Sequence, residues 1–330
     1  MQTLYVTDNG VQLNKKSNRI VLKKENKVVD EIPMMGLKRV IIFGNNQITT
    51  QLMQYFAFEG IDVAFLSSCG RFKFRLVSET SKNISLRMAQ HELYRDKPFR
   101  IQFSQSVVEA KIHNQRSLLV RYQRNRPEVD LKHHLEILKK CADQVKEKPE
   151  IDEIMGEEGY ASKTYFDAFG KLLLGGFEFS NRAYHPPPDP VNALLSFGYM
   201  VLFNEIAGLL EGTGFDAYLG FLHSTHYGRL SLATDLIEEL RSPLIDRLVL
   251  FLINTNSISL DQFSSNDNGV MMDSTATKTY LSNYEKFMTM EFMNVQSKKR
   301  THYRQILRDQ VSNLEKTLLQ NEEYKCYLYY

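Results

Sequence analysis

The sequence predicts an α+β protein in which a β-rich segment precedes a larger helical one. Residues 1–80 alternate short runs of β-branched and aromatic residues with turn signals such as Asp8-Asn9-Gly10, a pattern typical of strands. Strand signals end there, and 81–98 begins with the linker-like composition Ser81-Lys82-Asn83. From 99 to 330 the apolar residues recur at helical spacing. We therefore expect a β-rich domain over 1–80, a linker over 81–98 and a helical domain over 99–330.

Several strands can be placed in the first segment. Ile20-Val21-Leu22 is expected to pair with Val28-Val29 across a turn at Glu25-Asn26-Lys27. The continuous apolar run Val40-Ile41-Ile42-Phe43 ends at Gly44, which predicts a buried strand. After it the spacing becomes helical, and two further strands are expected at 61–66 and 72–76.

The helical segment begins with two helices of mixed charge. Apolar residues recur between Phe103 and Gln123, and this stretch also carries Lys111 among several arginines. Its basic charges spread around the helix, which favours a solvated surface over contact with phosphate. Residues 128–149 predict a second helix that serves packing and solubility.

The stretch 184–248 is expected to form the centre of the helical segment. Asp189 precedes Pro190, which is a usual way to begin a helix, and the following residues are apolar on nearly every side, as in a core helix. A second helix is expected from Arg229 to Arg241. Its leucines at a spacing of four face the core, while Asp235 and Glu238 share the opposite side.

Composition limits the class of protein. The formal net charge is only +2, so any binding of nucleic acid must come from local patches. The three cysteines, Cys69, Cys141 and Cys326, lack metal spacing and fit a reducing compartment. No secretory leader is visible, and the longest apolar run is shorter than the ~20 residues of a membrane span. We expect a soluble, cytoplasmic protein with no membrane partner.

Several motifs, in order along the chain, carry a resemblance to a known family. They are AKIHNQ at 110–115, GEEG at 156–159, PPPDPVNALLSFGY at 186–199, GFLH at 220–223, GRLSLATDLIEELR at 228–241, and Tyr303-Arg304 with Gln310. Together they resemble the CRISPR-associated integrase family, the universal nuclease of spacer acquisition. The match covers nearly the whole chain.

The resemblance implies a fold, an activity and partners. It implies a β-sandwich-like N-terminal domain that forms a homodimer, followed by an all-α catalytic domain. The implied activity is that of a metal-dependent DNA endonuclease and integrase, which inserts short DNA fragments (spacers) into a CRISPR repeat array by attack of a 3′-hydroxyl on a phosphodiester. The implied partners are double-stranded DNA, as spacer fragment and repeat, and the family's small second adaptation protein in a heterocomplex.

The resemblance also assigns an active site. The family's metal glutamate matches Glu158, its histidine matches His223 and its last acidic ligand matches Glu238, while Asp235 matches a supporting acidic position in the catalytic set. If these side chains converge, two carboxylates and one imidazole suit Mg²⁺ or Mn²⁺ better than zinc. We expect Glu158 to open a helix beside two glycines that permit close backbone approach. A zinc site that uses His226 with His223 is the less favoured alternative.

Basic residues near the C-terminus are the expected DNA contacts. Arg300, Arg304 and Arg308 are four apart, as on one face of a helix, and Lys299 lies beside them. The resemblance at Tyr303-Arg304 implies contact with DNA phosphates near the metal. The tail that follows departs from the family's usual Tyr-x-Pro-Phe ending.

Other functions remain open from the residues. A transposon-type integrase of the same fold is one alternative, and a non-catalytic DNA-binding scaffold is another. A nucleotide-binding loop is excluded, because Gly170-Lys171 lacks both the upstream glycine and the following Ser or Thr of a phosphate loop.

Overall fold

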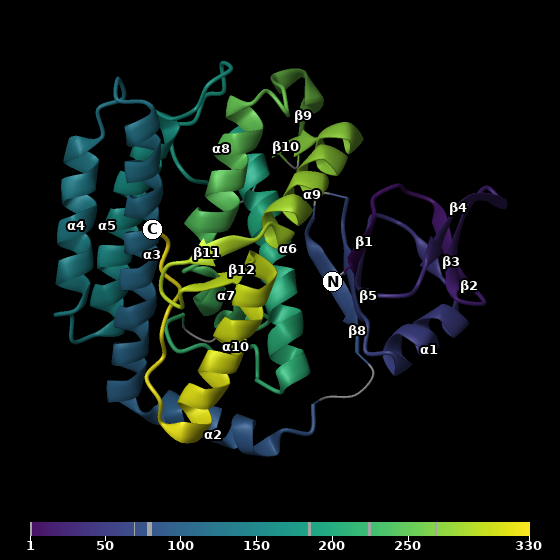
Figure 1. Cartoon of the computed structure of the whole chain (residues 1–330), viewed down its shortest axis with the longest axis horizontal. Helices are drawn as coiled ribbons and strands as arrows, with labels where there is room; N and C mark the ends of the chain where they lie inside the picture. Colours follow the sequence, from purple (N-terminus) through teal and green to yellow (C-terminus); the bar gives the residue numbers. More distant parts are fainter. Residues whose placement is uncertain (1, 69, 78–80, 184–185, 224–225, 268) are drawn as a thin grey trace. The chain divides into compact units, whose positions relative to one another are not determined.

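The computed structural model describes residues 2–68, 70–77, 81–183, 186–223, 226–267 and 269–330. The chain divides into two compact units, which can be followed by colour in Figure 1. The first comprises Met1–Thr80 with Met272–Leu281, and the second comprises Ser81–Met271 with Ser282–Tyr330. Sheets dominate the first unit and helices the second, so the predicted α+β class is confirmed.

The first unit contains two four-stranded sheets within its described residues. One has the order β1 (Gln2–Val6), β5 (Leu37–Phe43), β7 (Asp62–Leu66), β8 (Phe72–Leu76), and the other has the order β4 (Lys27–Pro33), β3 (Arg19–Lys24), β2 (Val11–Lys16), β6 (Gln47–Ile48). Residues of both sheets, such as Leu13 and Val40, share one hydrophobic cluster with Phe56 of α1 (Thr50–Phe58). One core therefore stabilises both sheets.

Pairing in this unit confirms the predicted hairpin. Strands β3 and β4 form it, and Glu25 and Asn26 turn the chain with positive φ values of 50° and 62°. The turn signal at 8–10 is also present as a turn, and it connects two different sheets, because β1 pairs in parallel with β5 while β2 pairs with β3 and β6. The buried strand predicted at 40–43 is confirmed within β5.

The second unit begins with a helix where a linker was expected. Helix α2 (Ile84–Arg95) is capped by Asn83, whose side chain accepts a hydrogen bond from the Leu86 amide at 3.3 Å. Buried Gln90 donates to the carbonyls of Asp216 and Leu219, both at 2.8 Å, and thereby fixes α2 to the unit. The linker prediction for 81–98 is therefore wrong. The helix was missed because α2 buries few apolar residues, so the apolar periodicity of its sequence is weak.

Four long helices form the frame of this unit. Helices α3 (Lys97–Asn125), α4 (Lys132–Val145) and α5 (Ile151–Gly170) pack pairwise and lie side by side in Figure 1. Helix α6 (Pro190–Thr213) begins as predicted, with the Asp189 carboxylate accepting from the Asn192 amide at 2.7 Å. Among described helices, α6 alone has the length and composition to cross a membrane, yet 72% of its apolar window is buried, as in a core helix.

The rest of the unit departs from the all-α expectation. It contains α7 (Ser231–Ile237), a π-helix (Arg241–Asp246), α8 (Arg247–Asn254), a 3₁₀ turn (Leu260–Gln262) and α10 (Tyr303–Gln320), together with the part of α9 (Ser274–Thr289) that follows Leu281. Two short two-stranded sheets interrupt these helices, one formed by β9 (Phe263–Asn266) with β10 (Gly269–Met272) and one by β11 (Phe292–Asn294) with β12 (Lys299–Thr301). The predicted helix 229–241 is shorter, because α7 ends at Ile237 and the π-helix follows.

Candidate active site

Asp235 organises the loop that carries His223. Its buried carboxylate accepts hydrogen bonds from the amides of Phe221 at 2.7 Å, Leu222 at 3.0 Å and His223 at 3.0 Å. The same carboxylate lies 2.7 Å from Nδ1 of His223. Because an ionised carboxylate only accepts, Nδ1 is the donor in this contact, and Nε2 is the ring nitrogen that Asp235 does not engage. This arrangement is the one that orients a metal-binding histidine.

Gly220 is required for this loop to pack. A Cβ atom at Gly220 would lie 2.9 Å from Oδ2 of Asp235 and 2.8 Å from the backbone of Ser231. A larger residue would therefore displace the carboxylate that holds the loop. Steric crowding therefore explains why the first residue of the GFLH motif is a glycine.

Glu158 and Glu238 are brought together by Lys111. Glu158 lies on α5, Glu238 lies just after α7, and the Lys111 ammonium on α3 makes an ion pair with each of them. Nζ of Lys111 is 2.6 Å from Oε2 of Glu238 and also contacts Oε1 of Glu158. Arg241 holds the other oxygen of Glu238 at 3.0 Å. Two carboxylates that are 80 positions apart in the chain therefore share one buried cation.

Charge, more than burial, determines ionisation at this cluster. Burial alone would raise the pKa of Glu238, but Arg241 and Lys111 lower that pKa to about 2. Burial likewise opposes the charge on Lys111, yet Glu158 and Glu238 hold its pKa above the usual value. The pKa of Glu158 is lowered, because Lys111 outweighs its burial and the repulsion from Glu238. His223 is close enough to Glu238 to contribute to lowering the pKa of that group.

The donor set fits a hard divalent cation. Oε2 of Glu238 is buried and accepts no hydrogen bond of normal geometry from any described residue, although it lies close to Lys111. The described part of the chain contains no group of three His, Cys, Asp or Glu side chains already arranged around one point, and the ammonium of Lys111 stands between two of the carboxylates. The cluster thus holds one positive charge in this structure, that of Lys111, and carboxylate oxygens with an imidazole are ligand types that suit Mg²⁺ or Mn²⁺.

The surroundings of Glu158 differ from those expected. Glu158 lies in the middle of α5, not at its start, and Ser162 one turn later donates to its carboxylate at 2.7 Å. A Cβ atom at Gly156 or Gly159 would meet nothing within 4 Å. The prediction that these glycines permit a close backbone approach is therefore wrong. Seven residues of helix precede Glu158 because α5 begins at Ile151, directly after Pro149-Glu150.

The four expected DNA-binding residues do not form one helical stripe. Lys299 and Arg300 lie on strand β12 and are exposed, whereas Arg304 and Arg308 lie on α10. Arg304 is only 1% exposed and makes ion pairs with Glu205 and Glu285. The assignment of Arg304 to DNA phosphates is wrong, since its guanidinium is used inside the protein. Arg308 is half-buried.

Lys111 and Arg241 are site residues that the sequence reasoning missed. Lys111 was counted among the solvated charges of its helix, yet it is buried. A signal was present, because Val107 and Val108 precede it by four and three positions and Leu118 follows it by seven, which places Lys111 on the apolar face.

Cys69 lies outside the described residues, whereas Cys141 and Cys326 are free thiols.

Comparison with known proteins gives consistent matches. The family model for CRISPR associated protein Cas1 matches residues 4–286. The CRISPR-associated endonuclease Cas1 3 of Thermus thermophilus is 33% identical over 318 residues, covering 96% of this chain and 93% of its own. Cas1 2 of Rhodospirillum rubrum is 34% identical over 303 residues, covering 87% of this chain and 86% of its own.

Solved structures share the fold. A casposase bound to its integration product aligns over 100% of this chain and 95% of its own, with a TM-score of 0.87 and 21% identity. A Cas1 protein from Thermotoga maritima aligns over 97% of both chains, with a TM-score of 0.80 and 24% identity. The resemblance expected from the motifs is confirmed, and this chain belongs to the Cas1 family.

Proposed function

We propose that this protein is a divalent-metal-dependent DNA endonuclease and integrase that inserts spacer fragments into a CRISPR repeat array. The observation that carries the proposal is the pair Glu158 and Glu238 on one buried cation, beside a histidine oriented by Asp235. Its relatives in Thermus and Rhodospirillum are named CRISPR-associated endonucleases, which supports this activity.

In this proposal Glu158, Glu238 and Nε2 of His223 hold Mg²⁺ or Mn²⁺. The bound ion would neutralise charge that develops on the phosphate and polarise the phosphorus centre. Asp235 keeps Nε2 free for the ion by binding Nδ1. Arg241 holds one oxygen of Glu238, so the other oxygen is the one presented to the cation. Lys111 supplies the positive charge at this point before an ion arrives.

The reaction exchanges one phosphodiester for another. The oxygen of a 3′-hydroxyl forms a bond to phosphorus, and the bond from that phosphorus to the original 3′-oxygen breaks. The attacking hydroxyl loses a proton and the leaving 3′-oxygen gains one. Because the number of phosphodiesters is unchanged, no nucleotide cofactor is needed, which agrees with the absence of a phosphate-loop motif in the sequence.

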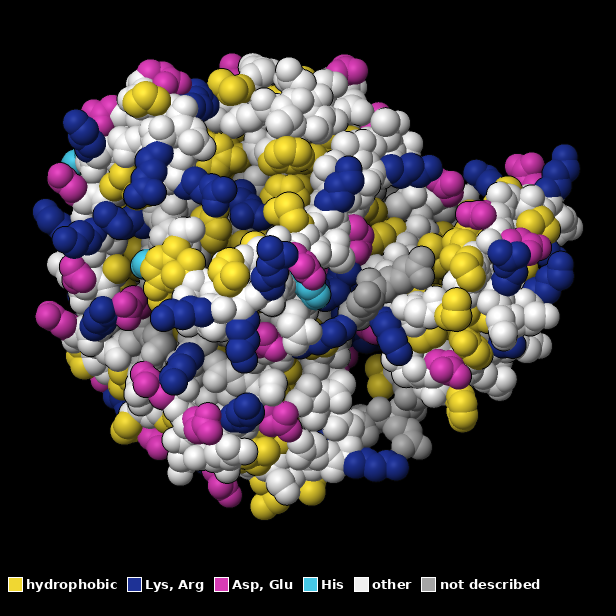
Figure 2. Space-filling model, viewed as in Figure 1, with side chains coloured by type: hydrophobic (Ala, Val, Ile, Leu, Met, Phe, Trp, Pro, Cys, Tyr) yellow, Lys and Arg dark blue, Asp and Glu magenta, His cyan; other side chains and the backbone are white. Residues whose placement is uncertain are grey.

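Exposed basic residues would contact the DNA. Lys and Arg side chains gather in a band across the helical unit in Figure 2, over α3 and the β11–β12 sheet. Lys299 and Arg300 belong to that sheet and are exposed, so they are the proposed phosphate contacts, together with Arg308.

Partners are proposed from the names of similar structures. One match is a Cas6-RT-Cas1–Cas2 complex, which aligns over 99% of this chain and 36% of its own, with a TM-score of 0.84 and 24% identity. We propose a homodimer formed through the β-rich unit, assembled in the cytoplasm with a Cas2-type protein. Residues of both sheets share one core, which supports treating this unit as a separate domain that could serve dimerisation.

Strand transfer tests the function. Wild-type protein with Mg²⁺ or Mn²⁺ is expected to join a short duplex with 3′-hydroxyl ends to a target that contains a repeat. Glu158→Ala, His223→Ala and Glu238→Ala are each expected to lose at least about 100-fold in rate, because each removes a proposed ligand.

Glu157→Ala is the matched control. Its carboxylate neighbours Glu158 in sequence but is 3.9 Å from Lys148. Equal activity in all these proteins would contradict the catalytic assignment and favour a non-catalytic scaffold. Joining to the ends of a mobile element in preference to a repeat would instead favour the transposon-type alternative.

A further inference from the structure

The last ten residues of the chain pack against the helical unit. Residues 321–330 form no helix or strand, yet Tyr324, Tyr327 and Tyr329 are only 5–6% exposed. The tail therefore buries three large side chains although it has no regular structure.

Glu239 is the main anchor of this tail. It is fully buried and directly follows Glu238. Its carboxylate accepts hydrogen bonds from Nε2 of Gln310 at 3.0 Å, from the hydroxyl of Tyr324 at 2.7 Å and from the amide of Tyr327. Two of these three donors belong to the tail, so the tail satisfies a buried carboxylate next to a proposed metal ligand.

Asn114 joins the tail to both sides of the site. Its side-chain amide donates to the carbonyl of Glu239 at 2.7 Å and to the carbonyl of Tyr327 at 2.9 Å. Its side-chain oxygen accepts from the amide of Tyr329 at 2.8 Å. Asn114 lies on α3, three residues after Lys111, so one side chain connects the segment of Glu238, the helix of Lys111 and the tail.

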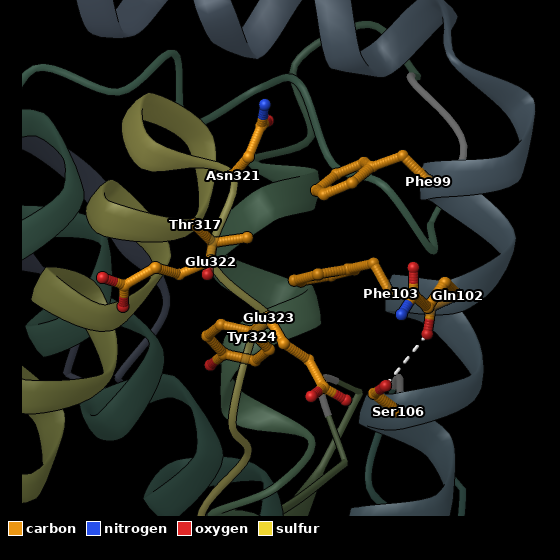
Figure 3. Close-up of a pocket in the computed structure, with 9 residues that line it drawn as sticks. All are labelled: Phe99, Gln102, Phe103, Ser106, Thr317, Asn321, Glu322, Glu323 and Tyr324. Atoms are coloured by element: carbon orange, nitrogen blue, oxygen red, sulfur yellow. Dashed lines mark hydrogen bonds between the residues drawn. The ribbon is translucent and has the colours of Figure 1, made fainter.

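Aromatic contacts extend this connection to the histidine loop. The ring of Tyr324 lies 5.1 Å from that of Phe103 on α3, and Figure 3 shows the two rings adjacent. Phe103 in turn lies 5.1 Å from the ring of Phe221. The amide of Phe221 is bound by Asp235, which also holds His223.

We propose that the C-terminal tail is a positioning strap that holds Glu238 and the His223 loop in metal-binding geometry through Glu239, Asn114 and Phe103. This inference rests on the proposed metal-dependent function. Glu239 and the tail residues touch neither metal nor DNA in this proposal. They are positioning residues, which act through the backbone of Glu238 and the packing of Phe221.

Mn²⁺ binding tests the strap without relying on catalysis. Glu239→Gln replaces one accepting oxygen with a donor that faces the donors of Gln310 and Tyr327. Its dissociation constant for Mn²⁺, followed by electron paramagnetic resonance, is expected to rise ~10-fold or more, as for other groups that orient metal ligands. Relative to wild type, the rate of strand transfer by Glu239→Gln should fall less at saturating Mn²⁺ than at limiting Mn²⁺.

Three further variants separate positioning from folding. Glu323→Gln neutralises an exposed carboxylate of the same tail and is expected to bind Mn²⁺ as wild type does. Tyr324→Phe removes only one hydroxyl donor and should weaken Mn²⁺ binding by a smaller factor. The double variant Glu239→Gln/Gln310→Glu exchanges donor and acceptor and is expected to recover part of the lost affinity.

The outcomes distinguish the strap from the function on which it rests. If wild-type protein binds no Mn²⁺, the proposed metal-dependent function fails. If wild type binds Mn²⁺ and Glu239→Gln melts at a lower temperature yet binds Mn²⁺ equally well below that temperature, the tail is structural and the strap is refuted. Should Glu239→Gln fail to fold, Tyr324→Phe decides, and Mn²⁺ binding equal to wild type then refutes the strap.

Discussion

Two buried cations in the helical unit each lie between two carboxylates, and they differ in how fully they are hydrogen-bonded. Arg304 places Nε 2.8 Å from Glu205 and its two terminal nitrogens 2.8 and 2.7 Å from the oxygens of Glu285. Tyr284 donates to the remaining oxygen of Glu205 at 3.0 Å. This cluster uses a planar guanidinium in a bidentate pair, a geometry that favours a permanent internal ion pair.

Lys111 forms the other cluster with short ion pairs but without a bidentate one. Its ammonium is a point charge between Glu158, whose side chain is 24% exposed, and an oxygen of Glu238 that accepts no normal hydrogen bond from the described residues. Such a charge can be replaced by another cation without breaking a bidentate pair. The comparison teaches that two buried cations with similar carboxylate partners can differ in geometry: a planar fork fixes both oxygens of one carboxylate, whereas a point charge bridges single oxygens of two carboxylates.

Removing Arg304 is expected to have the largest effect on stability. Arg304→Ala leaves Glu205 and Glu285 without their cation inside the protein, which should lower the free energy of unfolding by about 3–5 kcal/mol. Urea unfolding followed by circular dichroism measures this, and exposed Arg300→Ala is the control, expected to change it by less than about 0.5 kcal/mol. If Mn²⁺ restored the stability of Arg304→Ala, the distinction between the two clusters would be lost.

Removing Lys111 is expected to cost less, and a metal should compensate. Lys111→Met leaves Glu158 and Glu238 to repel each other, which should lower the free energy of unfolding by about 1–3 kcal/mol without metal. Saturating Mn²⁺ is expected to raise the melting temperature of Lys111→Met by more than it raises that of wild type. An equal or smaller rise would show that Lys111 assists the ion instead of standing in for it.

Another buried carboxylate, that of Asp246, extends the comparison to pH. Asp246 accepts hydrogen bonds from Tyr165 at 2.7 Å and from Tyr199, and burial raises its pKa although these hydrogen bonds oppose the rise. A raised folded-state pKa gives stability that is present below the unfolded value of about 3.9 and is lost as the pH rises through the folded value. The free energy of unfolding of wild type relative to Asp246→Asn should therefore be largest at low pH and decline as the pH rises. A constant difference would contradict the raised pKa.

The smallest effect on stability is expected at the exposed basic residues. Lys299→Ala and Arg300→Ala should leave the free energy of unfolding within about 0.5 kcal/mol of wild type. Each is expected to weaken binding to duplex DNA and to reduce the salt dependence of that binding by about one counterion. Fluorescence anisotropy at several salt concentrations measures this. An unchanged salt dependence would place the DNA elsewhere on the surface.

Local signals predicted much of the fold. The Asp189-Pro190 start of α6, the β3–β4 hairpin and the buried strand β5 depend on neighbouring residues, and they are confirmed. The parallel pairing of β1 with β5 joins residues far apart in the chain, so it left no local pattern.

Local sequence signals were also insufficient to predict the candidate active site. Family motifs indicated Glu158, His223 and Glu238, but nothing in the spacing showed that Lys111 would lie between two of them. Arg304 was misassigned because the four-residue spacing of Arg300 and Arg304 suggested that both lie on one helix. In the structure β12 ends at Thr301 and α10 begins at Tyr303. Long-range contacts decide which charged residues are buried, and the sequence pattern alone does not contain them.

The π-helix Arg241–Asp246 has a further consequence for how this chain tolerates changes in length. Its wider turn sets the spacing between Arg241, which binds Glu238, and Asp246, which binds two tyrosines. A π-turn holds one residue more than an α-turn, so a single deletion there can be absorbed by a return to α-helical winding, whereas a deletion within α8 would rotate everything after it by about 100°. A one-residue deletion in the π-helix is therefore expected to disturb the residues after it less than a one-residue deletion in α8 does.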